Sequence, residues 1–225
     1  MFNNLVLAIP HSVRELKSVW SDDSVQTDAD RWTDWFTDRI FNTTIDNVSK
    51  VVGTVSRFDC DLERLKNDPL EVNGNGIIYM NAPMGATRSV SKEDKEQLMS
   101  VWEGYQQSLL NELTEHSLLI DCHSFPSDVS ELDICVGFNS DWSKPSDEVI
   151  ELIETHFKDF GFSVGINTPY SNSITPIADF EYKSVMIELN KNIYFNEKTL
   201  QEHTYSYKVH NLINSLYSKL LTIPS

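Results

Sequence analysis

Residues 5–12 read LVLAIPHS, a continuous apolar run that is closed by a proline and followed by a histidine and a serine. Such a short run predicts a strand that is buried on both faces of a sheet. Residues 118–123 read LLIDCH, so a second apolar run ends in the same way. We therefore expect two buried strands, each of which presents a histidine, His11 or His123, at its C-terminal end.

The rest of the chain alternates between predicted strands and predicted helices. Apolar and β-branched runs predict further strands at residues 51–56, 132–138, 162–166 and 184–189. Apolar spacing and capping signals predict helices at residues 32–41, 91–115, 146–160 and 197–221. This alternation predicts an α/β fold with a central mixed, mostly parallel sheet and helices on both faces. A length of 225 residues fits a single domain, residues 1–225.

The composition narrows the classes of partner. The chain has 34 Asp and Glu against 18 Lys and Arg, and its formal net charge of −16 repels phosphate backbones and anionic lipids. We therefore expect neither nucleic-acid nor membrane partners. No apolar run approaches the roughly 20 residues that cross a bilayer, and no signal-peptide pattern opens the chain. Three widely spaced cysteines fit neither a disulfide framework nor a metal site, so we expect reduced thiols and a cytoplasmic protein.

Polar side chains at strand ends are the candidates for chemistry, because ligands of α/β sheets bind beyond the carboxyl ends of the strands. His11, the Asp121–His123 pair and Glu188 all lie at such positions. A histidine alone in this setting is more often a structural residue that is held by hydrogen bonds. Glu188 is harder to explain structurally, because burying an unpaired carboxylate costs free energy. A carboxylate in a buried strand is therefore either paired or retained for function.

Five segments of the chain, in sequence order, resemble the motifs of the N-formylglutamate amidohydrolase family. They are residues 9–12 (IPHS), 33–39 (TDWFTDR), 56–57 (SR), 121–124 (DCHS) and 187–191 (IELNK). The resemblance extends from Leu5 to about Tyr194. The family is related to zinc carboxypeptidases and aspartoacylases, so the resemblance implies a zinc-carboxypeptidase-like fold, also described as phosphorylase/hydrolase-like.

The resemblance implies a zinc site built from His11, His123 and Asp34. Two imidazole nitrogens and one carboxylate oxygen leave a fourth position for water, which is typical of a catalytic zinc rather than a structural one. Glu15 is a competing ligand, because it lies four residues after His11 and would face the same metal if a helix began there. The family match favours Asp34. Asp121, two residues before His123, would orient that histidine.

The resemblance also implies the catalytic and substrate-binding residues. Glu188 corresponds to the general base, which would take a proton from water and return it to the leaving nitrogen. Arg57 and Arg64 correspond to the two arginines of the family, one to polarise the scissile carbonyl and one to bind a substrate carboxylate. Arg57 is therefore a candidate for both catalysis and substrate binding. For Arg64, a surface salt bridge remains open as the alternative.

Three positions depart from the family pattern. Val13 replaces the glycine that often follows the histidine–serine pair, and Gln106 follows Tyr105 where the family usually has histidine. Glu63 replaces the asparagine before Arg64. Because Glu63 adds a negative charge beside the expected carboxylate clamp, we expect weakened affinity for N-formylglutamate itself.

Taken with the resemblance, these residues predict a zinc-dependent amidohydrolase that cleaves the amide C–N bond of a small N-formyl or N-acyl amino acid, with Zn²⁺ as cofactor. The alternative within enzymes is a zinc carboxypeptidase-like peptidase or amidase that acts on a peptide or a cell-wall fragment. The alternative outside enzymes is a homologue that binds metal without catalysis. Retention of Glu188 with both histidines favours an enzyme, because a protein that only binds metal needs no base. The sequence sets neither the oligomeric state nor the acyl group.

Overall fold

The computed structural model describes residues 2–66 and 68–223. The predicted single domain also includes four residues outside this description, at positions 1, 67, 224 and 225. Among the described helices, none has both the length and the apolar character that crossing a membrane requires. All three cysteines are buried free thiols, in agreement with the predicted reduced state.

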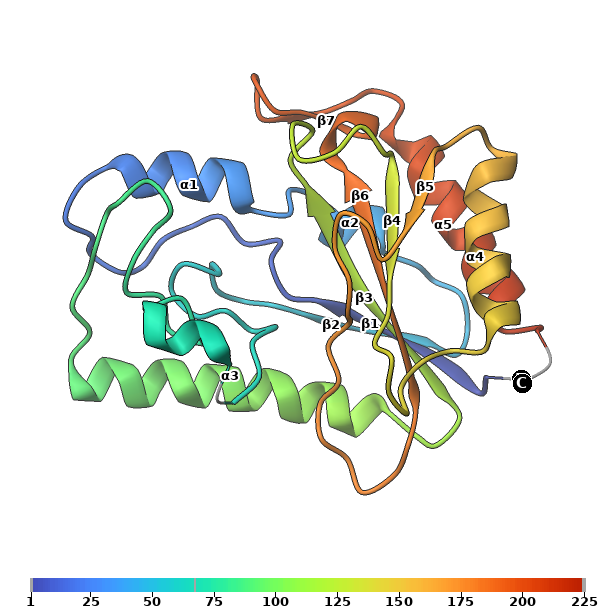
Figure 1. Cartoon of the computed structure of the whole chain (residues 1–225), viewed down its shortest axis with the longest axis horizontal. Coiled ribbons are helices and arrows are strands. Elements are labelled where there is room, and N and C mark those ends of the chain that lie inside the picture. Colours follow the sequence, from blue (N-terminus) through green and yellow to red (C-terminus); the bar gives the residue numbers. More distant parts are fainter. Residues whose placement is uncertain (1, 67, 224–225) are drawn as a thin grey trace.

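The centre of the molecule is a six-stranded sheet with the strand order β2-β1-β3-β6-β4-β5. Its strands are β1 (Asn4–Ile9), β2 (Val48–Val52), β3 (Ser117–Phe125), β4 (Ile134–Gly137), β5 (Val164–Ile166) and β6 (Lys183–Asn190). Strands β2, β1, β3 and β6 are parallel, whereas β4 runs antiparallel to β6 and pairs in parallel with β5. The predicted mixed, mostly parallel sheet is therefore confirmed (Figure 1).

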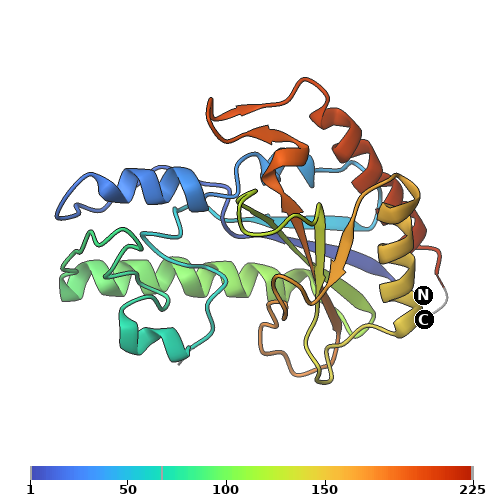
Figure 2. The same cartoon turned by 45° about the horizontal axis from the view of Figure 1, so that its top comes forward.

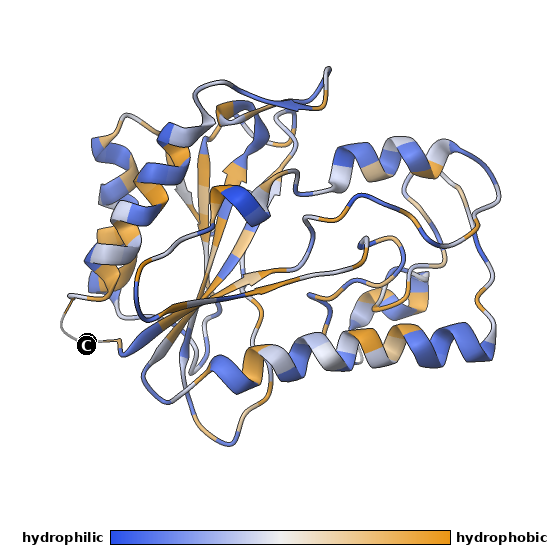
Figure 3. Ribbon diagram, turned by 180° about the vertical axis from the view of Figure 1, so that it is seen from behind, coloured by the Kyte–Doolittle hydropathy of each residue, from blue (hydrophilic) through white to orange (hydrophobic). Residues whose placement is uncertain are grey.

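Helices cover both faces of the sheet, as the sequence predicted. Helix α3 (Lys92–Glu112) lies on one face, and α4 (Asp147–Asp159) and α5 (Ser206–Leu220) lie on the other (Figure 1). At the start of α3, the Ser91 hydroxyl oxygen accepts a hydrogen bond of 3.1 Å from the Asp94 N–H, so the predicted cap is present. Figure 3 shows apolar residues along the strands and hydrophilic residues at the N-terminal end of α3.

Alternate residues of β1 pack on opposite faces of the sheet. Leu5 and Leu7 join the apolar core under α4 and α5, whereas Val6 and Ala8 join the core under α3. All four side chains are fully buried. Because neighbouring strand residues point to opposite faces, a strand covered on both sides needs a continuous apolar run rather than an alternating one.

Part of the molecule extends beyond the sheet. Helix α1 (Ser24–Trp32), the N-terminal half of α3 and the long connection from β2 to α3 lie there, as Figures 1 and 2 show. A small apolar core joins them, in which Val25 and Ala29 of α1 pack with Phe58 and Tyr79 of the connection. This extension lies over the ends of the central strands and supplies side chains to the cavity there.

The single helix predicted for residues 32–41 is wrong. Helix α1 ends where the predicted helix begins, and α2 (Thr37–Ile40) is a separate short helix. Between them Phe36 has a φ of 61°, a left-handed conformation that interrupts an α-helix. The break frees Asp34 from the helical path, and its N–H donates a hydrogen bond of 3.0 Å to the carbonyl oxygen of His11. Of the apolar residues that suggested one helix, Trp32 packs against the small core of the extension, and the others pack against the core under α4 and α5.

Strand β2 ends earlier than predicted, so residues 51–56 include only its last two residues and the start of the connection to α3. Gly53 follows the strand directly, and its N–H donates a hydrogen bond of 2.8 Å to the carbonyl oxygen of Ile9. A Cβ at this position would lie 2.2 Å from the carbonyl oxygen of Pro10, so only glycine fits without a shift of the backbone. After Gly53 the chain leaves the sheet and enters the extension.

The C-terminal segment also differs from the prediction. The helix predicted over residues 197–221 is shorter, because α5 begins at Ser206. The residues before it form a two-stranded hairpin of β7 (Phe195–Asn196) and β8 (Gln201–Glu202). The other predicted strands, and the helices α3 and α4, overlap their predicted ranges.

Candidate metal centre

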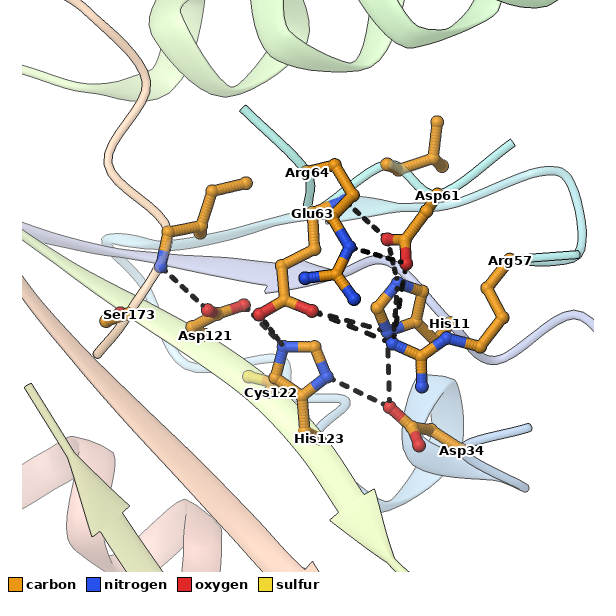
Figure 4. Close-up of polar contacts among 12 residues, drawn as sticks. His11, Asp34, Arg57, Asp61, Glu63, Arg64, Asp121, Cys122, His123 and Ser173 are labelled. Carbon is orange, nitrogen blue, oxygen red and sulfur yellow. Dashed lines mark hydrogen bonds and ion pairs between the residues drawn. The ribbon is translucent and has the colours of Figure 1, made fainter. Parts of the chain in front are cut away.

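Two histidines and one aspartate meet beyond the C-terminal end of β1. The candidate ligand atoms of His11, Asp34 and His123 lie within 4.8 Å of one another, and all three side chains are buried. Asp34 Oδ2 lies 3.0 Å from His123 Nδ1 and 3.7 Å from His11 Nδ1 (Figure 4). The structure thus brings together the three predicted ligands, and both Nδ1 atoms face the same carboxylate.

Three different elements hold these side chains in place. His11 follows β1 and His123 lies within β3, so two neighbouring parallel strands bring their rings together, with centroids 5.1 Å apart. Asp34 comes from the break between α1 and α2. Besides its N–H bond to His11, its carbonyl oxygen accepts a hydrogen bond of 2.8 Å from the Thr37 hydroxyl. The interrupted helix therefore turns Asp34 toward the histidines.

The second ring nitrogen of each histidine lies against a buried carboxylate. Asp61 Oδ1 lies 2.8 Å from His11 Nε2, and Asp121 Oδ1 lies 2.8 Å from His123 Nε2. A carboxylate accepts a hydrogen bond, so it favours the tautomer with the proton on Nε2 and leaves the Nδ1 lone pair for a metal. Asp121 is held in turn by the Ile174 N–H, which donates a hydrogen bond of 2.8 Å to its Oδ2.

The sequence analysis anticipated Asp121 but missed Asp61. Asp61 lies in the connection from β2 to α3, and only the folded chain places it next to His11. Its neighbours Cys60 and Leu62 are both almost completely buried. An acidic residue between two apolar ones was the signal that could have found it, by the same argument that singled out Glu188.

The chemistry of this centre fits a divalent metal ion such as zinc. Among the residues that the structure describes, His11 Nδ1 is buried without a hydrogen-bond partner, and a metal ion would satisfy this lone pair. Histidine nitrogens and a carboxylate oxygen are the usual ligands of catalytic zinc, at about 2.0–2.2 Å. The separation of 3.0 Å between His123 Nδ1 and Asp34 Oδ2 is compatible with two ligands on one ion.

The charges of the centre stabilise one another. Burial alone would raise the pKa of Asp34, but hydrogen bonds and charges from His11 and His123 outweigh it and hold this pKa well below its usual range. Burial alone would lower the pKa of His123, but Asp121 and Glu63 raise it well above its usual value. A raised pKa favours the charged imidazole with protons on both ring nitrogens, and a metal ion bound at Nδ1 would have to displace the proton there.

Glu15, the competing ligand, lies apart from this cluster. Its side chain is exposed, and in the described part of the chain it belongs to none of the groups that could share a metal. The residues after His11 form no helix within the described segment, so the spacing that would turn Glu15 toward a metal does not arise. Asp34 occupies that place instead.

Glu188 lies beside the histidines on the neighbouring strand. Strands β3 and β6 pair in register, with His123 opposite Glu188. Burial raises the pKa of Glu188 to about 8, although the charge of His123 opposes the rise and that of Asp34 adds to it. Glu188 lines a cavity of about 470 Å³ whose walls also include Asp34, His123, Arg57, Arg64 and Glu63.

Both predicted arginines reach this cavity, and carboxylates already engage them. Arg57 Nη2 lies 3.7 Å from Asp61 Oδ2 and 3.8 Å from Glu63 Oε2. Arg64 Nε lies 3.4 Å from Asp61 Oδ2, and its Nη1 lies 3.8 Å from Asp68 Oδ2. Because Asp61 is completely buried, a surface salt bridge does not describe the contact of Arg64.

Gln106, one of the departures from the family pattern, supports the loop that carries these residues. Its side-chain amide donates a hydrogen bond of 2.8 Å to the carbonyl oxygen of Leu62, between Asp61 and Glu63. Both Gln106 and the neighbouring Tyr105 are buried. This glutamine therefore has a structural role and lies behind the site rather than in it.

Comparisons with known proteins agree with this architecture. A family model described as N-formylglutamate amidohydrolase matches residues 3–195. Among solved structures, the N-formylglutamate amidohydrolase from Ralstonia eutropha JMP134 has a TM-score of 0.81 at 16% identity, over 98% of this chain and 93% of that one. A gene product of Agrobacterium tumefaciens has a TM-score of 0.69 at 13% identity, over 97% of this chain and 92% of that one. No sequence among curated proteins matches significantly.

These comparisons carry different weight. At such low identity, the two solved structures show only that the fold is shared. The family model is a comparison of sequence, and its match covers most of the chain, from before β1 to β7. The chain therefore belongs to the N-formylglutamate amidohydrolase family.

Proposed function

We propose that the protein is a zinc-dependent amidohydrolase that cleaves the amide C–N bond of a small N-formyl or N-acyl amino acid. Its family makes it an N-formylglutamate amidohydrolase-type hydrolase with a small-molecule substrate. The convergence of His11, His123 and Asp34 at one buried point, with a carboxylate behind each ring, supports the zinc. Glu188 in the adjoining cavity supports hydrolysis, because the reaction needs a base.

In this proposal each residue of the centre has one task. His11, His123 and Asp34 hold the metal, and Asp61 and Asp121 keep the two imidazoles in the orientation that presents Nδ1. Zinc bound there would act as a Lewis acid toward the substrate carbonyl and would lower the pKa of water. The chain itself supplies the proton transfer and the orientation of the substrate.

Glu188 moves the proton. Its carboxylate takes a proton from the attacking water, whose oxygen bonds to the acyl carbon, and delivers that proton to the nitrogen as the C–N bond breaks. The raised pKa of about 8 suits a group that must hold a proton between these steps. A metal ion held by His11, His123 and Asp34 would favour the carboxylate form of Glu188 that the first step needs. Arg57, at the edge of the cavity, donates to the carbonyl oxygen as negative charge develops there.

Metal content and hydrolysis together test the proposal. The purified protein should contain about one zinc per chain, lose hydrolysis of N-formyl or short N-acyl amino acids on chelation, and regain it with zinc. Peptides and cell-wall fragments form a second arm, and their preferred cleavage would replace this proposal with a carboxypeptidase-like activity. Zinc binding without hydrolysis of either class would indicate a homologue that binds metal without catalysis.

A further inference from the structure

Glu63 is a carboxylate in the cavity to which the proposed mechanism assigns no task. Its Oε2 lies 3.8 Å from Arg57 Nη2 and 3.9 Å from His11 Nδ1, and its Oε1 lies 3.9 Å from His123 Nε2 (Figure 4). None of these separations is short enough for a hydrogen bond. The side chain is 29% exposed, so a molecule in the cavity can contact the carboxylate that these neighbours leave available.

The loop fixes where Glu63 lies. Its N–H donates a hydrogen bond of 3.2 Å to Asp61 Oδ1, the same oxygen that lies 2.8 Å from His11 Nε2. The preceding residue, Leu62, is almost completely buried and accepts the hydrogen bond from Gln106. The backbone at Glu63 is therefore tied to the histidine centre, which places its side chain in the cavity.

The charges around Glu63 disfavour a substrate anion at this point. Asp61 is shared between the two arginines, at 3.7 Å from Arg57 and 3.4 Å from Arg64, and Asp68 also approaches Arg64. Glu63 adds a further carboxylate on Arg57. A substrate carboxylate bound here would meet a like charge at about 4 Å, in a cleft where charges are less screened than in water.

A substrate cation is disfavoured as well. Arg57 lies 3.8 Å from Glu63, and a metal ion held by His11 and His123 would add positive charge to the same side of the cavity. An uncharged N–H donor avoids both repulsions. It also forms a charge-assisted hydrogen bond with the carboxylate, which is stronger than a bond between neutral groups.

We propose that Glu63 selects N-acyl amino acids that carry a primary amide where N-formylglutamate carries a carboxylate. This inference rests on the proposed function, because it names the substrate class of the same site. Arg57 keeps its task at the acyl carbonyl, and Glu63 accepts an N–H of the substrate amide. A site built to bind a donor rejects an analogue that lacks it, so the discrimination is large.

Three compounds of nearly the same shape test the inference: N-formyl-L-glutamate and its two mono-amides, at the side chain and at the α-carboxyl group. The wild type should hydrolyse one mono-amide with a kcat/KM at least about tenfold above that of N-formylglutamate. Glu63→Gln should raise kcat/KM for N-formylglutamate and reduce this ratio at least about tenfold. Glu103→Gln removes an exposed carboxylate of α3 and, as the matched control, should leave the ratio unchanged.

Binding measured without turnover separates this inference from the proposed function. In zinc-loaded Glu188→Gln, calorimetric titration should show tighter binding of the preferred mono-amide than of N-formylglutamate, and adding Glu63→Gln should remove the difference. Zinc content should stay unchanged in Glu63→Gln, and its loss would overturn the inference by making Glu63 a ligand. An unchanged ratio in Glu63→Gln would overturn the inference alone.

The remaining outcomes concern hydrolysis. If no N-acyl compound is hydrolysed but the binding preference and its loss in Glu63→Gln are observed, the proposed function fails and the selection by Glu63 stands. If none of the three compounds binds while other N-acyl amino acids are hydrolysed, the inference is overturned and the proposed function stands.

Discussion

The residues of the site come from two kinds of structure, strands and loops. His11, His123 and Glu188 follow or belong to β1, β3 and β6, which are neighbours in the sheet. Apart from Asp121, which lies on β3, the other charged groups come from the break between α1 and α2 and from the connection between β2 and α3. Backbone hydrogen bonds of the sheet fix the first group, whereas a small number of side-chain contacts fix the second.

This difference assigns different tasks to the two regions. A sheet holds side chains with the precision that metal binding and proton transfer need. Loops tolerate substitution without loss of the core, so they are where substrate preference changes. On this view, Glu63 changes which substrates the site binds, while His11 and His123 maintain the metal centre on which hydrolysis depends.

Removal of either histidine of the centre should have the largest effect. His11→Ala and His123→Ala should each abolish stoichiometric zinc binding and hydrolysis, because the ligands that remain hold zinc far more weakly. Elemental analysis of the purified variants measures this, and circular dichroism checks that they fold. Full zinc content in both variants would exclude the proposed centre.

The loop ligand has its own matched control. Asp34→Asn should lower zinc affinity sharply, because an amide oxygen carries no charge, whereas Glu15→Gln should leave it unchanged. The opposite result would move the third ligand to Glu15. Comparable losses in Asp34→Asn and the histidine variants would show that a loop can hold a ligand as well as the sheet does.

Glu188→Gln should keep the zinc and lose catalysis by at least about 10²-fold, the low end for a general base. The substitution is nearly isosteric, and the melting temperature should hold or rise because a buried charge is removed. Zinc content, melting temperature and kcat measured on this variant separate proton transfer from a structural role. Unchanged turnover with zinc retained would exclude Glu188 as the base.

Asp61 and Asp121 compare a loop with a strand in the same task. Asp61→Asn and Asp121→Asn should each weaken zinc binding by about 10–100-fold, the usual effect of losing the carboxylate behind a ligand histidine. The loss of zinc affinity should be larger for Asp61→Asn, because Asp61 also neutralises the charges of Arg57 and Arg64. Chelator competition measures both affinities, and Asp68→Asn is the control for a nearby loop carboxylate. If both variants bound zinc as tightly as the wild type, neither aspartate could be needed to position its histidine.

The strand part of the site was predictable from the sequence because it rests on local patterns. A buried parallel strand needs a continuous apolar run, so the places of His11, just after β1, and of His123, near the C-terminal end of β3, follow from counting along the chain. Glu188 stood out because a carboxylate between apolar residues requires a reason. The strand order and the direction of β4 depend on distant pairings that no local pattern contains.

The loop part was not predictable in the same way. Residues 32–41 have the apolar spacing of one helix, yet the left-handed Phe36 splits it, and Asp34 reaches the centre only because of that break. The family resemblance, not the periodicity, named Asp34. Asp61 contacts a side chain far away in the sequence, so its place behind His11 appears only in the folded chain. Glu63 was noticed only as a departure from the family pattern, and its position between Arg57 and the histidines likewise appears only in the folded chain.

His156 lies on α4, between the sheet face and α5, away from the metal centre. Its titration should make the stability of the fold depend on pH independently of the site. His156 Nε2 donates to the carbonyl oxygen of Leu212 at 3.0 Å, and Lys219 Nζ donates to His156 Nδ1 at 3.0 Å. This ring is therefore neutral in the fold. Burial lowers the pKa of His156, and the positive charge of Lys219 adds to the effect, although the Leu212 carbonyl and Asp159 oppose it.

The sign of the pH effect follows from that lowered pKa. In the unfolded chain His156 titrates near its ordinary pKa of about 6.5, so as the pH falls the unfolded state takes up the proton first and the free energy of unfolding decreases. The melting temperature of the wild type should therefore drop more between about pH 7.5 and about pH 5.5 than that of His156→Gln. His116→Gln, which removes an exposed histidine, should keep the wild-type slope. Each comparison uses the change of melting temperature with pH and not the melting temperature itself. The hydrogen bonds lost in His156→Gln lower the melting temperature at every pH and so do not affect this change. An equal or steeper slope in His156→Gln would mean that the folded protein holds this ring charged, against the neutral state that Lys219 imposes.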